Sequence, residues 1–250
     1  MTPPQVFATT HWTLVQRTRG ESPEARAALA ELCEAYWTPV FRFLRRDGRD
    51  EDAARELTQE FFTRLLAGSG VRSADPAHGR FRTYLLGAVK HFLADQRERD
   101  GRLKRGAGVV PQSLDAPASG PSDTAVGLQV PDPAAPLSDR WFDREWALAV
   151  MDRALRSLER EYASAGKTGH YQVLKTWLGG GEPDRPQAEA ARQLGLTEGA
   201  FKVALHRLRR RLRDLVRADL AQTLPEGTDP DEELGYLIEV LADFTAGSAR

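Results

Sequence analysis

Residues 197–217 form a strongly basic segment that carries one lysine and six arginines against one glutamate and one aspartate. Guanidinium groups at this density suit phosphate oxygens, and arginine also donates paired hydrogen bonds to base edges in the major groove of DNA. Apolar side chains recur within the same segment at steps of three and four residues, which predicts one helix with a single buried stripe. The charges would then lie on the remaining faces. The stripe consists of Phe201, Leu205, Leu208, Leu212 and Leu215.

A short helix and a tight turn are predicted directly before this segment. Ala188 and Ala191 fall on one face of a helix over 187–194, Gly195 permits the turn, and Thr197 can cap a second helix over 197–218. This order is typical of a helix-turn-helix motif, whose second helix brings its N-terminal residues to base edges. For the arginines alone, a solvated basic helix or a coiled-coil partner is the alternative. The predicted DNA contacts are Thr197, Ala200 on a thymine methyl group, Lys202, His206, Arg207, and Arg210 and Arg211 on the backbone.

The composition is that of a globular protein with one or two domains, since 41% of the 250 residues are hydrophobic and 28% are charged. No stretch approaches the roughly 18 consecutive apolar residues of a membrane helix, and the first residues lack a signal-peptide pattern, so we expect a cytoplasmic location. The single cysteine, Cys33, cannot form an internal disulfide and is expected to be a small core side chain. No cysteine or histidine pair has zinc spacing, and we expect no cofactor.

Charge and composition divide the chain, although its net charge is only −1. Residues 106–139 contain six prolines and four aspartates but no lysine or arginine. Such a segment buries too little apolar surface to offset the entropy of ordering, which predicts a flexible linker. Helical periodicity dominates on either side, so we predict an all-α fold of two small helical modules. The predicted divisions are an N-terminal extension 1–23, a module 24–105, the linker 106–139, a module 140–222 and an acidic tail 223–250.

The N-terminal module is expected to hold three helices. The first, through 29–44, should kink near Pro39, and the second, over 50–67, should begin at Asp50 as its N-cap. The third runs from Phe81 towards residue 102 and is basic, because residues 80–105 hold eight basic and three acidic side chains. In the C-terminal module, further helices are predicted over 141–162 and 171–178, ahead of the helix-turn-helix.

The tail has the opposite charge. Residues 225–244 hold seven acidic side chains and no lysine or arginine, and Leu234, Leu237, Ile238 and Leu241 recur with helical periodicity. One hypothesis is that this helix folds onto a basic module and competes with DNA. The alternative is that it packs against the C-terminal module without regulating it.

Three stretches, in this order, resemble the motifs of bacterial RNA polymerase sigma factors of the extracytoplasmic-function type, a sigma-70 group that keeps only the second and fourth conserved regions. "EDAARELTQEFFTRLL" is similar to the second-region helix, and "GRFRTYLLGAVKHFLADQRERDGR" to the promoter-melting helix after it. "AEAARQLGLTEGAFKVALHRLRRRLRDLV" is similar to the fourth-region helix-turn-helix. With its N-terminal and acidic C-terminal extensions, the chain resembles a diverged subfamily.

The resemblance implies a protein that binds core RNA polymerase and directs it to promoter DNA, with an anti-sigma factor or the chain's own acidic tail as a restraint. The helix-turn-helix would bind the upstream promoter element, and Tyr84 would stack on a flipped base while Phe81 and Phe92 stay in the core. The residues implied for polymerase binding are Asp52, Glu56, Gln59 and Glu60. Those implied for the melted element are Arg82, Tyr84, Lys90, His91, Arg97 and Arg99.

Two other functions fit parts of the sequence. A helix-turn-helix repressor or activator that never joins polymerase would use the same basic helix, but would have no need of the acidic docking face. A metal-dependent nuclease or recombinase would use the acidic cluster Asp50, Glu51, Asp52 and Glu56, whose position at a helix start is already explained by capping and the helix dipole. His91 and Asp95, four residues apart on a helix, lack a third metal ligand.

Overall fold

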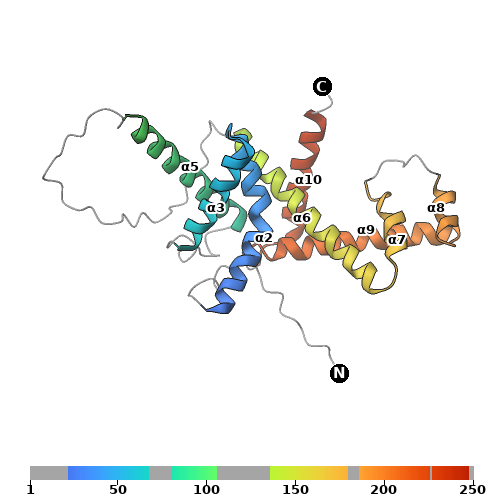
Figure 1. The fold of residues 1–250 in the computed structure, drawn as a ribbon. Coiled ribbons are helices and arrows are strands. Elements are labelled where there is room, and N and C mark those ends of the chain that lie inside the picture. Colours follow the sequence, from blue (N-terminus) through green and yellow to red (C-terminus); the bar gives the residue numbers. More distant parts are fainter. Residues whose placement is uncertain (1–21, 68–79, 106–135, 180–185, 226, 248–250) are drawn as a thin grey trace, which may run out of the picture. The chain divides into compact units, whose positions relative to one another are not determined.

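The computed structural model describes residues 22–67, 80–105, 136–179, 186–225 and 227–247, and all the regular elements within these ranges are helices. The all-α prediction is therefore confirmed. Most of the predicted linker, and all of the N-terminal extension except residues 22 and 23, lie outside the described residues. The helices are α2 (Pro23–Arg46), α3 (Glu51–Ala67), α5 (Phe81–Arg105), α6 (Pro136–Ser164), α7 (Thr168–Lys175), α8 (Gln187–Gln193), α9 (Glu198–Ala221) and α10 (Pro230–Gly247) (Figure 1).

The chain forms two compact units whose boundary falls inside α6, between Trp146 and Ala147. Residues 140–146 were expected to open the C-terminal module, but they group with the first unit, as do residues 223–227. The reason is apolar packing, because Phe142 and Trp146 are fully buried there and the Trp146 ring stacks on Tyr36 with 4.6 Å between ring centroids.

The core of the first unit is rich in aromatic side chains from α2, α3, α5 and the start of α6. Phe61 of α3 contacts Phe92 of α5 edge to face, at 5.6 Å between centroids. Asp50 caps α3 as predicted, since its Oδ1 accepts a hydrogen bond of 2.8 Å from the Ala53 N–H. α2 continues through the buried Pro39 as one helix, so the proline predicted to kink the helix does not end it.

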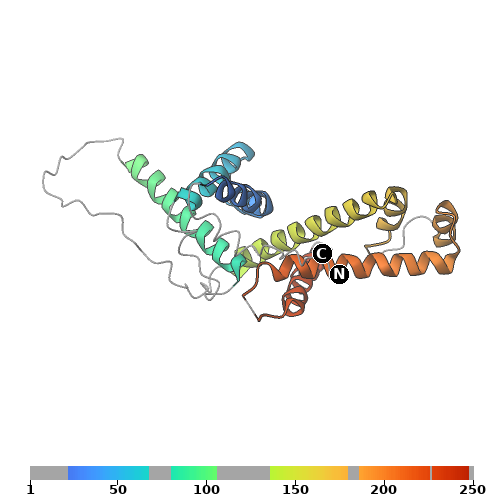
Figure 2. The same cartoon turned by 90° about the horizontal axis from the view of Figure 1, so that it is seen from below.

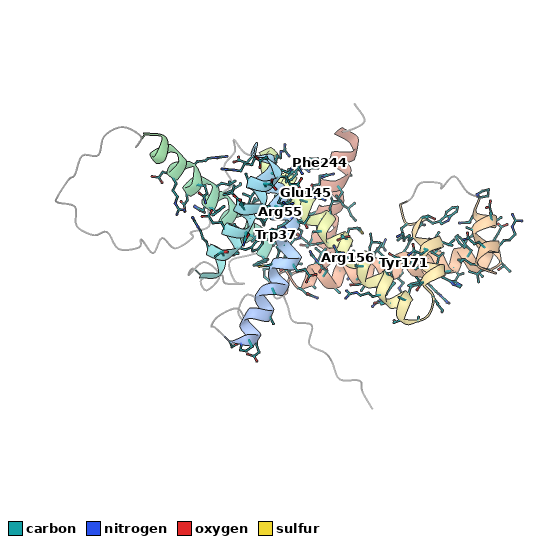
Figure 3. All side chains as sticks on the ribbon, in the orientation of Figure 1. Trp37, Arg55, Glu145, Arg156, Tyr171 and Phe244 are labelled. Atoms are coloured by element: carbon teal, nitrogen blue, oxygen red, sulfur yellow. The ribbon has the colours of Figure 1, made fainter. Side chains whose placement is uncertain are left out.

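The second unit is built around α9. The later part of α6 runs antiparallel beside α9 (Figure 2). Two ion pairs link the helices, Arg153 with Asp219 and Glu161 with Arg211. Tyr171 of α7, labelled in Figure 3, donates a hydrogen bond of 3.2 Å to the Leu155 carbonyl. The core consists of Leu158, Tyr171, Leu174, Ala190, Ala191, Phe201, Leu205 and Leu208.

The fully buried positions of α9 move to a different face of the helix towards its C-terminal end. Leu212 and Leu215 continue the predicted stripe, since both pack against the core, although each is only partly buried. Val216 and Leu220 are buried instead. α10 packs against α9, and its own Leu237 and Val240 are buried, so a second helix contact is added to the stripe there.

Candidate nucleic-acid interface

The helix-turn-helix has the geometry that its sequence predicts. Gly195 takes a positive φ of 65°, a conformation that glycine adopts without strain, and thereby closes the turn between α8 and α9. The Leu196 N–H donates a hydrogen bond of 2.9 Å to the Ala191 carbonyl. Thr197 caps α9, because its Oγ1 accepts a hydrogen bond of 3.1 Å from the Ala200 N–H. The first turn of α9 is therefore fixed in position relative to α8.

The exposed side of α9 carries every residue predicted to contact the upstream element. Phe201, Leu205 and Leu208 are buried on the side that packs against the unit, so the polar and basic positions between them face outward. Arg209 is used within the fold, since it donates a hydrogen bond of 2.7 Å to the Trp177 carbonyl. The exposed residues are Thr197, Ala200, Lys202, His206, Arg207, Arg210 and Arg211.

Arg211 differs from its neighbours because it already has an anionic partner. Its guanidinium donates two hydrogen bonds, of 2.9 and 2.6 Å, to the carboxylate of Glu161 on α6. These hydrogen bonds lower the pKa of Glu161 below its usual value. A phosphate would have to displace Glu161 to bind Arg211. Sequence reasoning missed this pair because the two residues are 50 positions apart.

Three of the residues predicted for the melted element are held inside the first unit. Arg82 is 5% exposed and lies 3.2 Å from the carboxylate of Asp143 on α6. Lys90 is partly buried and paired with Asp139 of the same helix. Tyr84 is partly buried, and burial raises its pKa to about 12. In this conformation these side chains contact the protein, and Arg82 presents almost no surface to a ligand.

The other three, His91, Arg97 and Arg99, lie on the exposed part of α5. Arg97 pairs with Asp47, and Arg99 lies 3.8 Å from Glu60. Exposed ion pairs of this kind contribute about 0–1 kcal/mol, so a phosphate can replace the carboxylate at low cost. These three residues form the accessible part of the predicted strand-binding surface.

Three of the four residues predicted to bind polymerase share one face of α3. Asp52, Glu56 and Gln59 are exposed and follow one another at steps of four and three residues. Glu60 lies apart from them: it is partly buried and accepts a hydrogen bond of 2.7 Å from Gln96 of α5. The candidate docking face is therefore Asp52, Glu56 and Gln59.

Acidic residues at the start of α6 form an ionic network that sequence reasoning did not find. Glu145, labelled in Figure 3, is 2% exposed and lies 2.6 Å from the Arg42 guanidinium of α2. Arg144 pairs with the same carboxylate. With Asp139 and Asp143, this helix thus supplies three carboxylates to basic residues of α2 and α5. No local spacing predicts which distant arginine a carboxylate will meet.

No family model, curated protein or solved structure matches the chain.

α10 meets α9 beyond the predicted contact residues. Asp231 of α10 pairs with Arg217 of α9 at 2.9 Å. Arg217 follows Arg211 by six residues, so at 1.5 Å per residue it lies about 9 Å further along the axis of α9. In this conformation α10 leaves the exposed residues of the first turns of α9 accessible. Ile238, which its periodicity had assigned to the buried face, is 57% exposed.

No group of three or more histidine, cysteine or carboxylate side chains in the described part of the chain has the arrangement of a metal site. Burial raises the pKa of Cys33 to about 11, which keeps the thiol protonated and unreactive at neutral pH. Among the described helices, none has the length and apolar character needed to cross a membrane.

Proposed function

We propose that this chain is a sigma factor of the extracytoplasmic-function type, which acts in the cytoplasm with core RNA polymerase and directs promoter recognition, DNA melting and transcription initiation. The observation that carries the proposal is the capped second helix of a helix-turn-helix, buried on one side by an apolar stripe and basic on the other. The ordered likeness of three motifs to that family supports the same assignment.

In the second unit, the N-terminal half of α9 enters the major groove of the upstream element. Lys202, His206 and Arg207 contact base edges and nearby phosphates, and Arg210 binds the backbone. Arg211 joins them only where a phosphate displaces Glu161.

In the first unit, the exposed face Asp52, Glu56 and Gln59 docks on a basic surface of core polymerase, where complementary charge sets orientation and association rate. Arg97 and Arg99 then contact the backbone of the melted strand. Lys90 reaches the strand only after the start of α6 moves away, because Lys90 is now paired with Asp139. Tyr84 is partly buried and presents only part of its ring to the strand.

The test is run-off transcription by core polymerase and the full chain on a library of genomic fragments. We expect specific transcripts that are lost in the double variant Arg207→Ala, Arg210→Ala, which still binds core polymerase. The variant Glu56→Lys is expected to lose polymerase binding. Glu198→Gln, which removes one acid from the second unit instead, is the control and should keep it. Specific DNA binding without any association with core polymerase would indicate the repressor or activator.

A further inference from the structure

Val203 is an apolar side chain in the middle of the basic face of α9. It is 50% exposed, one of two large hydrophobic side chains that are exposed in the described ranges. It follows Phe201 and precedes Leu205 by two residues each, so at 3.6 residues per turn it lies about 160° around the axis from both. Val203 therefore points directly away from the core that anchors the helix.

Gly199, one turn earlier, shares this face. A Cβ atom built on Gly199 would meet no atom within 4 Å, and the residue is helical with no positive φ. Neither packing nor backbone conformation therefore requires a glycine here. Glycine and the β-branched valine are both poorer helix formers than alanine, so neither residue is explained by the stability of α9.

Together Gly199 and Val203 form a narrow apolar strip on the exposed surface of α9, called the lane below, and polar side chains border it. Ala200 lies beside them, and the exposed His206 and Arg207, three and four residues after Val203, lie next to it on the helix surface. Lys202 directly precedes Val203 and is also exposed. Because Gly199 has no side chain, another molecule can approach this part of the helix closely. The basic side chains beside the strip favour a partner that carries negative charge. The edge of a thymine in the major groove fits both requirements, because its 5-methyl group is apolar and phosphates flank it.

We propose that Gly199 and Val203 seat the 5-methyl group of one thymine in the upstream promoter element, so that Val203 makes this position specific for thymine. The inference rests on the proposed function. From the sequence, Ala200 was expected to contact a thymine methyl group. In the present proposal Ala200 lies beside the lane, and Val203 makes the main apolar contact with the methyl group.

The experiment begins with the full chain bound to core polymerase and selects its preferred sequence from random duplexes. Each thymine of the selected element is then replaced, one at a time, by deoxyuridine, which lacks only the 5-methyl group. For the wild type we expect one position where this change lowers affinity about fourfold, the value of one buried methyl group. In Val203→Ala the same change should have no further effect, and the coupling of the two changes isolates the contact.

Gly199→Ala provides a second readout with a distinctive sign. Since the added methyl group meets open space, we expect a higher midpoint of thermal unfolding together with a several-fold loss of affinity for the selected element. Gly235→Ala and Ile238→Ala are the matched controls, because Gly235 is an equally open helical glycine and Ile238 an equally exposed apolar residue on α10. Both should leave DNA affinity unchanged.

The outcomes separate this inference from the function on which it rests. If a sequence is selected but no thymine shows coupling to Val203, the lane is not a methyl site and the sigma-factor proposal survives. If Val203→Ala weakens binding of core polymerase and leaves deoxyuridine discrimination intact, Val203 contacts protein and the inference is overturned. A lower unfolding midpoint for Gly199→Ala would show that the glycine serves the fold. Failure to recruit polymerase or to select any sequence would remove both proposals.

Discussion

Arg210 and Arg211 are adjacent arginines on α9, and we expect their replacement by alanine to affect DNA binding very differently. Both side chains are exposed, but Arg211 is held by two hydrogen bonds to Glu161, whereas Arg210 makes no ion pair with any described residue. A phosphate that binds Arg210 gains a whole positive charge. A phosphate that binds Arg211 must first release a carboxylate, so the net gain is small.

The size of the effect follows from counterion release. Each phosphate neutralised contributes about −0.9 to the slope of log affinity against log salt concentration. If Lys202, Arg207 and Arg210 each neutralise one phosphate, their combined slope is about −2.7, and affinity falls about 40-fold between 50 and 200 mM salt. Arg210→Ala reduces this to about −1.8 and about 12-fold. Arg211→Ala should leave the slope close to that of the wild type.

Glu161→Gln supplies the converse test, because it frees the Arg211 guanidinium for a phosphate. We expect the slope to steepen by about 0.9. Glu159→Gln is the matched control: it removes a charge of the same sign from the same helix, but Glu159 bonds to Gln172 and not to an arginine of α9.

Fluorescence anisotropy with a labelled promoter duplex and the polymerase complex gives the slopes over a series of salt concentrations. Core polymerase contributes its own phosphate contacts, so only differences between variants are compared. Equal losses for Arg210→Ala and Arg211→Ala, or equal slopes for Glu161→Gln and Glu159→Gln, would refute the reasoning.

Three further predictions concern the fold. Trp146→Ala removes a ring that is 1% exposed and stacked on Tyr36, and should cost about 3–5 kcal/mol in urea unfolding, well above the cost of Trp141→Ala at a partly exposed site. Burial raises the pKa of Tyr84 from 10.0 to about 12, so the contribution of its neutral side chain to stability is complete below pH 10 and is lost as the pH rises to about 12. The variant Tyr84→Phe should therefore lose less stability over that pH range. Urea unfolding at each pH measures the difference. Deleting residues 228–250 uncovers Val216 and Leu220 and should lower the midpoint of thermal unfolding. If the tail competes with DNA, the deletion should also raise DNA affinity. An unchanged DNA affinity would rule out that hypothesis.

Local signals in the sequence were sufficient for the helix-turn-helix. The cap at Thr197, the turn at Gly195 and the first three residues of the α9 stripe depend on neighbours within about one or two turns, so their spacing carries the information. The cap of α3 at Asp50 is local in the same way. These features were predicted correctly.

The division of the chain was harder to predict, because composition marks where a helix can begin and says little about where packing changes. The linker composition ends near residue 139, and a regular helix continues from there to Ser164. Phe142 and Trp146 carry the same apolar signal as Val150 and Leu158, yet the first pair packs in one unit and the second pair lies in the other. Periodicity identifies the buried face of α6 but not the partner that buries it.

For the same reason, the sequence of α5 alone does not show which of its basic side chains are exposed and able to bind DNA. Arg82 and Arg97 lie on the same basic helix and received the same predicted role. Phe81, Leu85 and Val89 define the buried face of α5, and Arg82 stands at its border, about 100° from Phe81. A border position is exposed or buried according to what packs beside it, and here the start of α6 brings Asp143 to the guanidinium. Arg97 pairs with the partly buried Asp47 and keeps 64% of its own side-chain surface exposed. A basic helix therefore reveals that phosphate can be bound, while the set of arginines free to bind it is decided by acidic residues distant in the sequence.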